Sequence, residues 1–139
     1  MTMRRSLLLL SAAVLIAAVP LLASAQGTKP ALYTADQASA GAAVYAQACG
    51  ACHGAQLEGV AAPALKGSVF GEMATAQGLT VDALLDVIAN TMPQSDPGSL
   101  KPEDYSAVTA YILQQNGYPA GTAALAKGAA GLKDAKVTP

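Results

Sequence analysis

The stretch Cys49-Gly50-Ala51-Cys52-His53 decides the fold of this chain, because it contains both cysteines and the only histidine of the 139 residues. Two thiols separated by two residues can form thioether bonds to a haem, and a histidine directly after the second thiol is placed to ligate the iron. The motif therefore predicts a single covalently attached haem c, bound through Cys49 and Cys52, with His53 as one axial ligand of the iron.

Three other kinds of site use cysteines in a similar way. A thioredoxin-like dithiol needs a βαβ setting, whereas the flanking segments are rich in Ala, Gly and Gln at helical spacing and contain no run of β-branched residues. A structural zinc site needs four Cys or His ligands, and this chain has three. A nucleophilic site would need His53 as a general base, which conflicts with iron ligation. Dithiol chemistry is the alternative that remains if no haem is attached.

The amino terminus has the pattern of an export signal. Two arginines precede a mostly apolar stretch over residues 7–22, and three small residues follow as Ala23-Ser24-Ala25. This pattern predicts a signal peptide over residues 1–25, cleaved after Ala25, and therefore a periplasmic protein. The alternative is an uncleaved membrane anchor, because the apolar stretch approaches the roughly 20 residues that cross a bilayer. Only under that alternative do we expect contact with a membrane.

Composition after Ala25 excludes one class of partner and indicates how the core is filled. Six lysines and nine acidic residues give a formal charge of −3, with no basic stripe that would bind nucleic acid. The length suits one domain. With no Trp, one Phe and five Tyr, the chain has little large apolar surface to bury. A haem would supply that apolar volume, and we expect the protein without haem to be unstable.

Capping residues and apolar spacing predict an all-α fold with three main helices wrapped with loops around the haem. The first helix begins after Thr34, which is expected to form a capping box with Gln37. Its apolar face leads into the haem motif and consists of Gly41, Val44, Tyr45, Ala48 and Cys52.

Two further helices follow in the second half of the chain. The second begins after Thr80 and ends near Thr91, because Pro93 prevents its continuation. Its predicted buried residues are Val81, Leu84, Leu85 and Ile88. The third begins at Pro102 and ends before Gly117. Its predicted buried residues are Tyr105, Val108, Tyr111 and Ile112.

These elements divide the exported chain into three parts. Residues 26–34 are predicted to be a short linker and residues 35–119 the haem domain. Residues 120–139 show no apolar periodicity, which predicts a flexible C-terminal tail.

The second axial ligand is expected to be a methionine sulfur, since the only histidine is already used. Met73 and Met92 are the candidates outside the predicted signal peptide. Pro93 favours an extended conformation for Met92 and stops the preceding helix, so a loop can present the Met92 side chain to the far face of the haem. Met73 has no such constraint and fits a core-filling role. Met92 is therefore the predicted ligand.

On these residues the chain resembles a monohaem class I cytochrome c of the small periplasmic type over residues 35–118. The resemblance rests on five features, namely the run from Gly41 to Cys49, the haem motif, Pro63-Ala64-Leu65, Met92-Pro93 and Tyr111-Ile112-Leu113. It implies that the first and last helices cross with Gly41 against Tyr111. It also implies that the carbonyl of Pro63 accepts a hydrogen bond from His53 and so orients the ring as a ligand. The family's tryptophan near a haem propionate has no counterpart here.

The function implied by the resemblance is one-electron transfer rather than catalysis, because His53 and Met92 would leave no open position on the iron. The stretches 92–100 and 111–121 are most similar to small cytochromes associated with quinoprotein dehydrogenases. Expected partners are redox proteins such as a quinoprotein dehydrogenase, a cytochrome reductase or a terminal oxidase, met by a monomer in transient complexes. The alternative is a cytochrome subunit bound within a periplasmic quinoprotein alcohol or aldehyde dehydrogenase.

Overall fold

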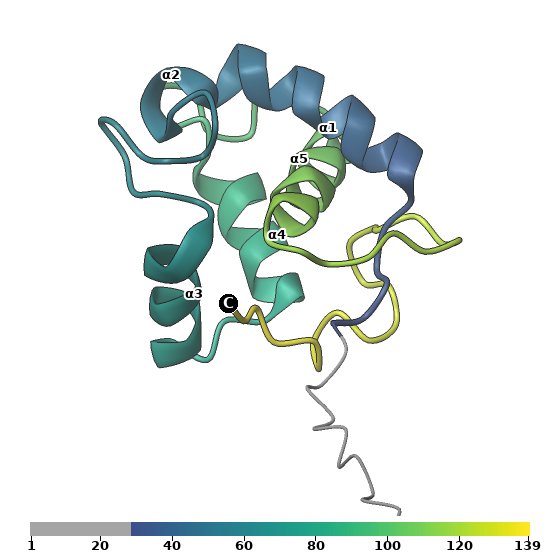
Figure 1. Ribbon diagram of the computed structural model, residues 1–139. Helices are drawn as coiled ribbons and strands as arrows, with labels where there is room; N and C mark the ends of the chain where they lie inside the picture. Colours follow the sequence, from purple (N-terminus) through teal and green to yellow (C-terminus); the bar gives the residue numbers. More distant parts are fainter. Residues whose placement is uncertain (1–28) are drawn as a thin grey trace, which may run out of the picture.

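The computed structural model describes residues 29–139, which form helices joined by irregular loops (Figure 1). The helices are α1 (Ala35–Ala48), α2 (Gly50–His53), α3 (Gly67–Ala76), α4 (Val81–Thr91) and α5 (Pro102–Gln115). Within this range there is no β-strand, only an isolated antiparallel bridge between Thr80 and Lys136. The predicted all-α fold is confirmed. No helix in the described range is long and apolar enough to cross a membrane. The predicted signal peptide and its cleavage site lie outside the described residues.

The crossing of α1 and α5 is made possible by a glycine. A Cβ atom at Gly41 would overlap the backbone carbonyl of Ala107, so the two helices approach closely only because Gly41 has no side chain. Tyr111 packs instead against Tyr45 of α1, with ring centroids 5.3 Å apart and planes tilted by 53°. The contact between the first and last helices is confirmed. The predicted Gly41–Tyr111 pair stays a prediction: the atoms nearest to Gly41 are backbone atoms of Ala107 and Val108, and the ring beside Tyr111 is that of Tyr45.

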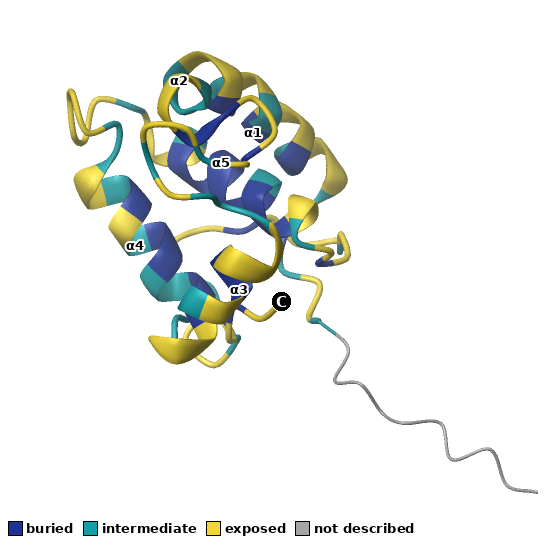
Figure 2. Ribbon diagram, turned by 60° about the vertical axis from the view of Figure 1, so that its left-hand side comes forward, coloured by how far each residue is buried: buried dark blue, intermediate teal, exposed yellow. Residues whose placement is uncertain are grey.

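Helix α5 is the centre of the fold and is buried on nearly all sides (Figure 2). The buried residues of α5 are Tyr105, Ser106, Ala107, Val108, Thr109, Ala110, Ile112 and Leu113. The predicted Tyr105, Val108 and Ile112 are among them, whereas Tyr111 is half-buried. The hydroxyl of the buried Thr109 donates to the carbonyl of Tyr105 at 2.9 Å, so that its polar group is satisfied within the helix.

Threonine side chains cap two helices at the predicted positions. The Thr34 hydroxyl accepts from the Gln37 amide at 3.2 Å, and the Thr80 hydroxyl accepts from the Ala83 amide at 3.1 Å. The capping box is only half formed, because the Gln37 side chain turns away from Thr34. Its amide group donates to the carbonyl of Leu125 at 2.7 Å and accepts from the Leu125 N–H at 2.8 Å.

Helix α3 was not among the predicted helices. It begins after Lys66, which provides no side-chain cap, and buries only Phe70, Gly71 and Ala74. Three apolar or small residues without a capping signal give a weak periodic pattern, and the helix is held by tertiary packing.

The prediction of a flexible tail over residues 120–139 is wrong. Leu125, Leu132 and Val137 are each 1% exposed and belong to the core. The Val137 amide donates to the carbonyl of Leu79 at 2.8 Å, which ties the end of the chain to the turn before α4. In Figure 1 this segment, drawn in yellow, returns along the lower side of the helices. The buried apolar residues of this segment lie in irregular backbone at uneven spacing, so the sequence shows no periodic pattern that would predict their burial.

The described part of the predicted linker is also packed. Tyr33 is fully buried, and its hydroxyl donates to the carbonyl of Tyr118. Burial raises the pKa of Tyr33, so the phenol remains a donor. The haem domain therefore includes residues on both sides of the predicted 35–119 boundaries.

Candidate functional site

The Cys49–His53 motif is a single helical turn that continues from α1. Cys49 both ends α1 and begins α2, and its carbonyl accepts from the amides of Cys52 at 3.1 Å and His53 at 3.0 Å. Cys49 is half-buried and Cys52 is exposed, and neither forms a disulfide bond among the described residues. Helical φ and ψ angles over this short segment place the two thiols and the imidazole within one turn.

The imidazole of His53 is held in one orientation. Its Nδ1 lies 2.8 Å from the carbonyl oxygen of Pro63, the contact that the family resemblance implied. A carbonyl can only accept, so Nδ1 carries the proton and the lone pair lies on Nε2. The side chain is largely buried, at 9% exposure. With Nδ1 donating to Pro63, Nε2 is the ring nitrogen that can ligate a metal.

The loop after the motif folds back onto it through backbone hydrogen bonds. The carbonyl of Cys52 accepts from three consecutive amides, those of Val60 at 3.2 Å and of Ala61 and Ala62 at 3.0 Å. The His53 carbonyl accepts from Gly59 at 2.7 Å. These contacts bring Pro63 to His53 although ten residues separate them.

Leu57 anchors this loop in an uncommon conformation. It is fully buried and has a φ of 62°, in the left-handed region that non-glycine residues rarely adopt. Its carbonyl accepts from Leu65 at 2.9 Å. The burial of a large apolar side chain and this hydrogen bond hold the strained backbone in place.

Tyr45 of α1 is hydrogen-bonded to the residue that follows the motif. Its hydroxyl donates to the carbonyl of Gly54 at 2.7 Å, just after His53. Burial, with the nearby Cys49 as the next contribution, raises the pKa of Tyr45 to about 12, so the phenol stays protonated and donates. The sequence placed Tyr45 on the apolar face of the first helix but did not predict this bond. A buried tyrosine hydroxyl needs a partner, and that rule is the signal that could have found it.

Met92 lies where the sequence predicted, at the end of α4 and outside the helix. Its backbone is extended, with φ −123° and ψ 152°, and its side chain is half-buried against the core. Thr91 is the last residue of the helix, in agreement with the helix-stopping role of Pro93. The connection between α4 and α5 lies toward the same end of the molecule as α2 (Figures 1 and 2). Met73 lies on α3, also half-buried against the core.

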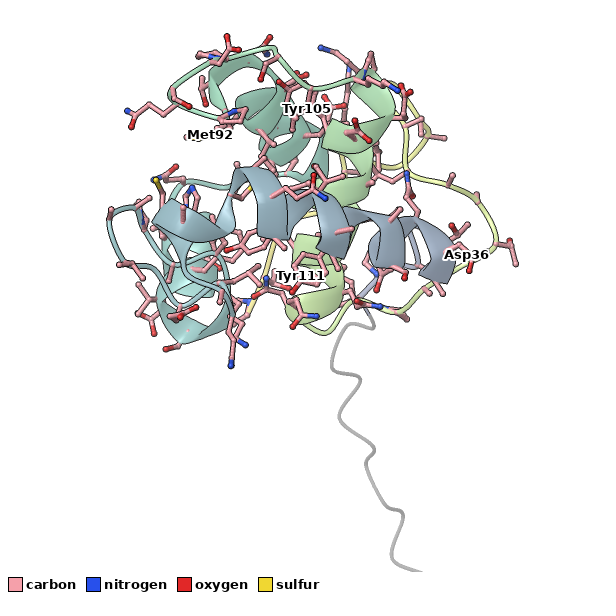
Figure 3. The ribbon with its side chains drawn as sticks, turned by 90° about the horizontal axis from the view of Figure 1, so that it is seen from above. Asp36, Met92, Tyr105 and Tyr111 are labelled. Carbon is pink, nitrogen blue, oxygen red and sulfur yellow. The ribbon has the colours of Figure 1, made fainter. Side chains whose placement is uncertain are left out.

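Tyr105 contacts the backbone next to Met92, and the sequence did not predict this contact. Its hydroxyl donates to the carbonyl of Met92 at 3.0 Å and accepts from the amide of Leu100 at 3.2 Å. In Figure 3 Tyr105 lies beside Met92, whereas Tyr111, farther along the same helix, lies away from it.

Reactive-thiol chemistry has little support in this geometry. A nucleophilic cysteine needs a lowered pKa, whereas burial raises the pKa of the Cys49 thiol. Among the described residues no group of three or more His, Cys, Asp or Glu side chains is placed to hold a metal ion by itself.

The residues present fit a haem attached at this motif. Two unpaired thiols flank the turn, Nε2 of His53 is left free by the bond to Pro63, and the half-buried Met92 provides a thioether sulfur. Two thiols can form the thioether bonds that attach a c-type haem, and an imidazole with a methionine sulfur is the ligand pair of iron in cytochromes c.

Comparison with known proteins gives a family and a fold. The family model described as cytochrome C oxidase, cbb3-type, subunit III matches residues 36–112, more than half of the chain. A chain in the crystal structure of the sulfane dehydrogenase SoxCD from Paracoccus pantotrophus is 27% identical, with a TM-score of 0.51, over 68% of this chain and 49% of that chain. This chain thus spans about half the length of the SoxCD chain it matches. No curated protein matches it.

Proposed function

This chain belongs to the family of c-type cytochrome domains described as cytochrome C oxidase, cbb3-type, subunit III, and we propose that it carries single electrons in the periplasm through one covalently attached haem c. The bond between His53 Nδ1 and the Pro63 carbonyl is the observation that carries the proposal. In this bond Nδ1 donates to the Pro63 carbonyl, so Nε2 is the nitrogen whose lone pair is available to the iron. When bound, the haem supplies a one-electron couple between ferric and ferrous iron.

Each residue of the site has a separate role in this proposal. Cys49 and Cys52 form the thioethers that fix the haem to the turn after α1. His53 ligates the iron, and Pro63 holds its ring and raises its basicity. Met92 would provide the second ligand to the iron, and its sulfur would favour a higher reduction potential than a second histidine would.

Electron transfer follows from the ligand set rather than from the fold alone. If His53 and Met92 both ligate the iron, they would leave no position on it for a substrate, and the protein would exchange electrons without binding a substrate there. Residues 26–139 carry a formal charge of −3. This charge favours partners with a positive docking surface and predicts association that weakens as salt increases.

A role as the cytochrome component of a dehydrogenase complex is the second candidate. It is supported by the similarity to a chain of sulfane dehydrogenase SoxCD. That match favours a sulfur-compound dehydrogenase over the quinoprotein alcohol or aldehyde dehydrogenase that the sequence suggested. A cytochrome reductase and a terminal oxidase remain the other redox partners that we propose.

Removal of each thiol in turn tests covalent attachment. In a host that exports the chain and attaches haem, Cys49→Ala and Cys52→Ala should each retain one thioether. The wild-type peptide that contains residues 49–53 should carry the mass of haem after denaturation and digestion. Each single variant should therefore keep its haem under denaturing extraction, whereas the double variant Cys49→Ala/Cys52→Ala should lose all of it. Haem that survives the extraction in the double variant, or no haem on the wild-type peptide, would contradict the proposal.

A further inference from the structure

We propose that Tyr105 is a positioning residue that holds Met92 in place as an iron ligand by closing both ends of the loop over residues 92–100. This inference rests on the proposed His53/Met92 ligation. One hydroxyl makes both bonds, donating to the carbonyl of Met92 at 3.0 Å and accepting from the amide of Leu100 at 3.2 Å.

The loop has little else to hold it. Residues 94–99 are all exposed. The Met92 amide donates to the Ile88 carbonyl of α4 at 3.1 Å, and the remaining hydrogen bonds of the loop among the described residues are two local turns, from the Asp96 amide to the Pro93 carbonyl at 2.9 Å and from the Ser99 amide to the Asp96 carbonyl at 3.3 Å. Neither turn ties the loop to the helices. A segment with exposed backbone and few buried contacts opens at low free energy.

Tyr105, by contrast, stands on the most extensively buried helix of the described residues. It is 5% exposed in the first turns of α5, the helix that packs against both α1 and α4. The Tyr105 hydroxyl therefore links the backbone at both ends of the loop to helix α5. The phenol bonds to the backbone of Met92 and leaves the side chain of Met92 unbonded, so the sulfur remains available as a ligand.

The structure provides a matched control on the same helix. Tyr111 is half-buried and its ring packs against Tyr45, but its hydroxyl makes no hydrogen bond within residues 29–139. Tyr105→Phe and Tyr111→Phe remove the same atom from the same helix, and only the first removes the loop contacts.

Competition with imidazole measures how firmly Met92 is held. We would titrate ferric holoprotein with imidazole at constant pH and follow the loss of the far-red band of methionine sulfur on ferric iron. We expect Tyr105→Phe to bind imidazole at least tenfold more tightly than the wild type, since it loses two hydrogen bonds. Tyr111→Phe should bind imidazole as the wild type does. Equal affinities in Tyr105→Phe and Tyr111→Phe would overturn the proposal.

A measurement on the wild type covers the case in which Tyr105→Phe does not accumulate as holoprotein. The Leu100 amide should be protected from hydrogen exchange, although it borders an exposed loop, and this protection should fall at least tenfold when imidazole displaces Met92. Protection that does not change on imidazole binding would refute the coupling. If wild-type ferric protein lacks the far-red band, the His53/Met92 ligation itself fails. If the band is present and only the Tyr105 effects are missing, the positioning role alone fails.

Discussion

The Nδ1 atom of His53 is hydrogen-bonded to the carbonyl oxygen of Pro63 at 2.8 Å, across a loop that begins directly after the Cys49–His53 turn. The bond fixes both the tautomer and the plane of the only imidazole in the chain. It depends on the loop between the two residues, which is built from backbone hydrogen bonds to Cys52 and His53. The geometry of the proposed ligand is thus set by main-chain contacts next to it in sequence.

Replacement of Met92 tests the second ligand. Met92→Ala should open the sixth position of the iron, lower the reduction potential and allow carbon monoxide to bind to the ferrous protein. Met73→Ala is the matched control, because Met73 is also half-buried against the core. Optical titration with carbon monoxide distinguishes the two variants. Carbon monoxide binding by Met73→Ala alone would reverse the ligand assignment.

Gly41→Ala should be strongly destabilising, since its Cβ atom would overlap the Ala107 carbonyl where α1 and α5 cross. Overpacking of this kind costs about 1–3 kcal/mol or more. Gly50→Ala is a suitable control, because a Cβ atom there would lie 3.6 Å from the nearest atom, the Tyr45 carbonyl oxygen, which is ordinary contact. Chemical denaturation of both holoproteins gives the difference. Equal stability of the two variants would show that the crossing relaxes without loss.

Gln37 is expected to anchor the C-terminal segment. Its side chain makes two hydrogen bonds to the backbone of Leu125. Gln37→Ala would leave two backbone groups without partners and should destabilise the protein by about 1–3 kcal/mol. Gln47→Ala, at an exposed position of the same helix, should have little effect. If hydrogen exchange of the Leu125 amide is unchanged in Gln37→Ala, the anchor is unimportant.

Glu58 is expected to make the stability of the protein depend on pH in the acid range. Hydrogen bonds from backbone N–H groups, its own first and then that of Gln56, lower the pKa of this exposed carboxylate. A lowered folded-state pKa contributes stability that is present above the unfolded-state pKa and is lost as pH falls through the folded-state pKa. Glu58→Gln should therefore lose stability at neutral pH and show a flatter decline in stability below about pH 4.3, the ordinary pKa of glutamate. The check is denaturant unfolding as a function of pH. If the free energy of unfolding falls identically with decreasing pH in the variant and the wild type, Glu58 does not contribute to the acid dependence.

The sequence predicted those features that depend on local chemistry. Thr34 and Thr80 cap their helices, and Pro93 stops α4 so that Met92 is extended, because each effect acts within four residues of its cause. The contact of Pro63 with His53 followed from the family resemblance rather than from local pattern.

The features it did not predict depend on contacts between distant segments. Leu132 and Val137 sit in irregular backbone without periodic spacing, so their burial is visible only in three dimensions. Tyr105 was expected in the core, but its hydroxyl partners on Met92 and Leu100 depend on where the loop returns. Gly41 was expected at a helix crossing, yet which atom it meets depends on the register of α1 on α5.

The visible spectrum of the exported protein, oxidised and reduced, tests the central claim most directly. We expect a low-spin c-type spectrum with the weak far-red band of methionine sulfur on ferric iron in the folded protein, and haem that stays attached to the chain after denaturation. A c-type spectrum without that band would contradict ligation by Met92 and reopen the sixth position. The absence of any haem would contradict the account as a whole and return Cys49 and Cys52 to dithiol chemistry.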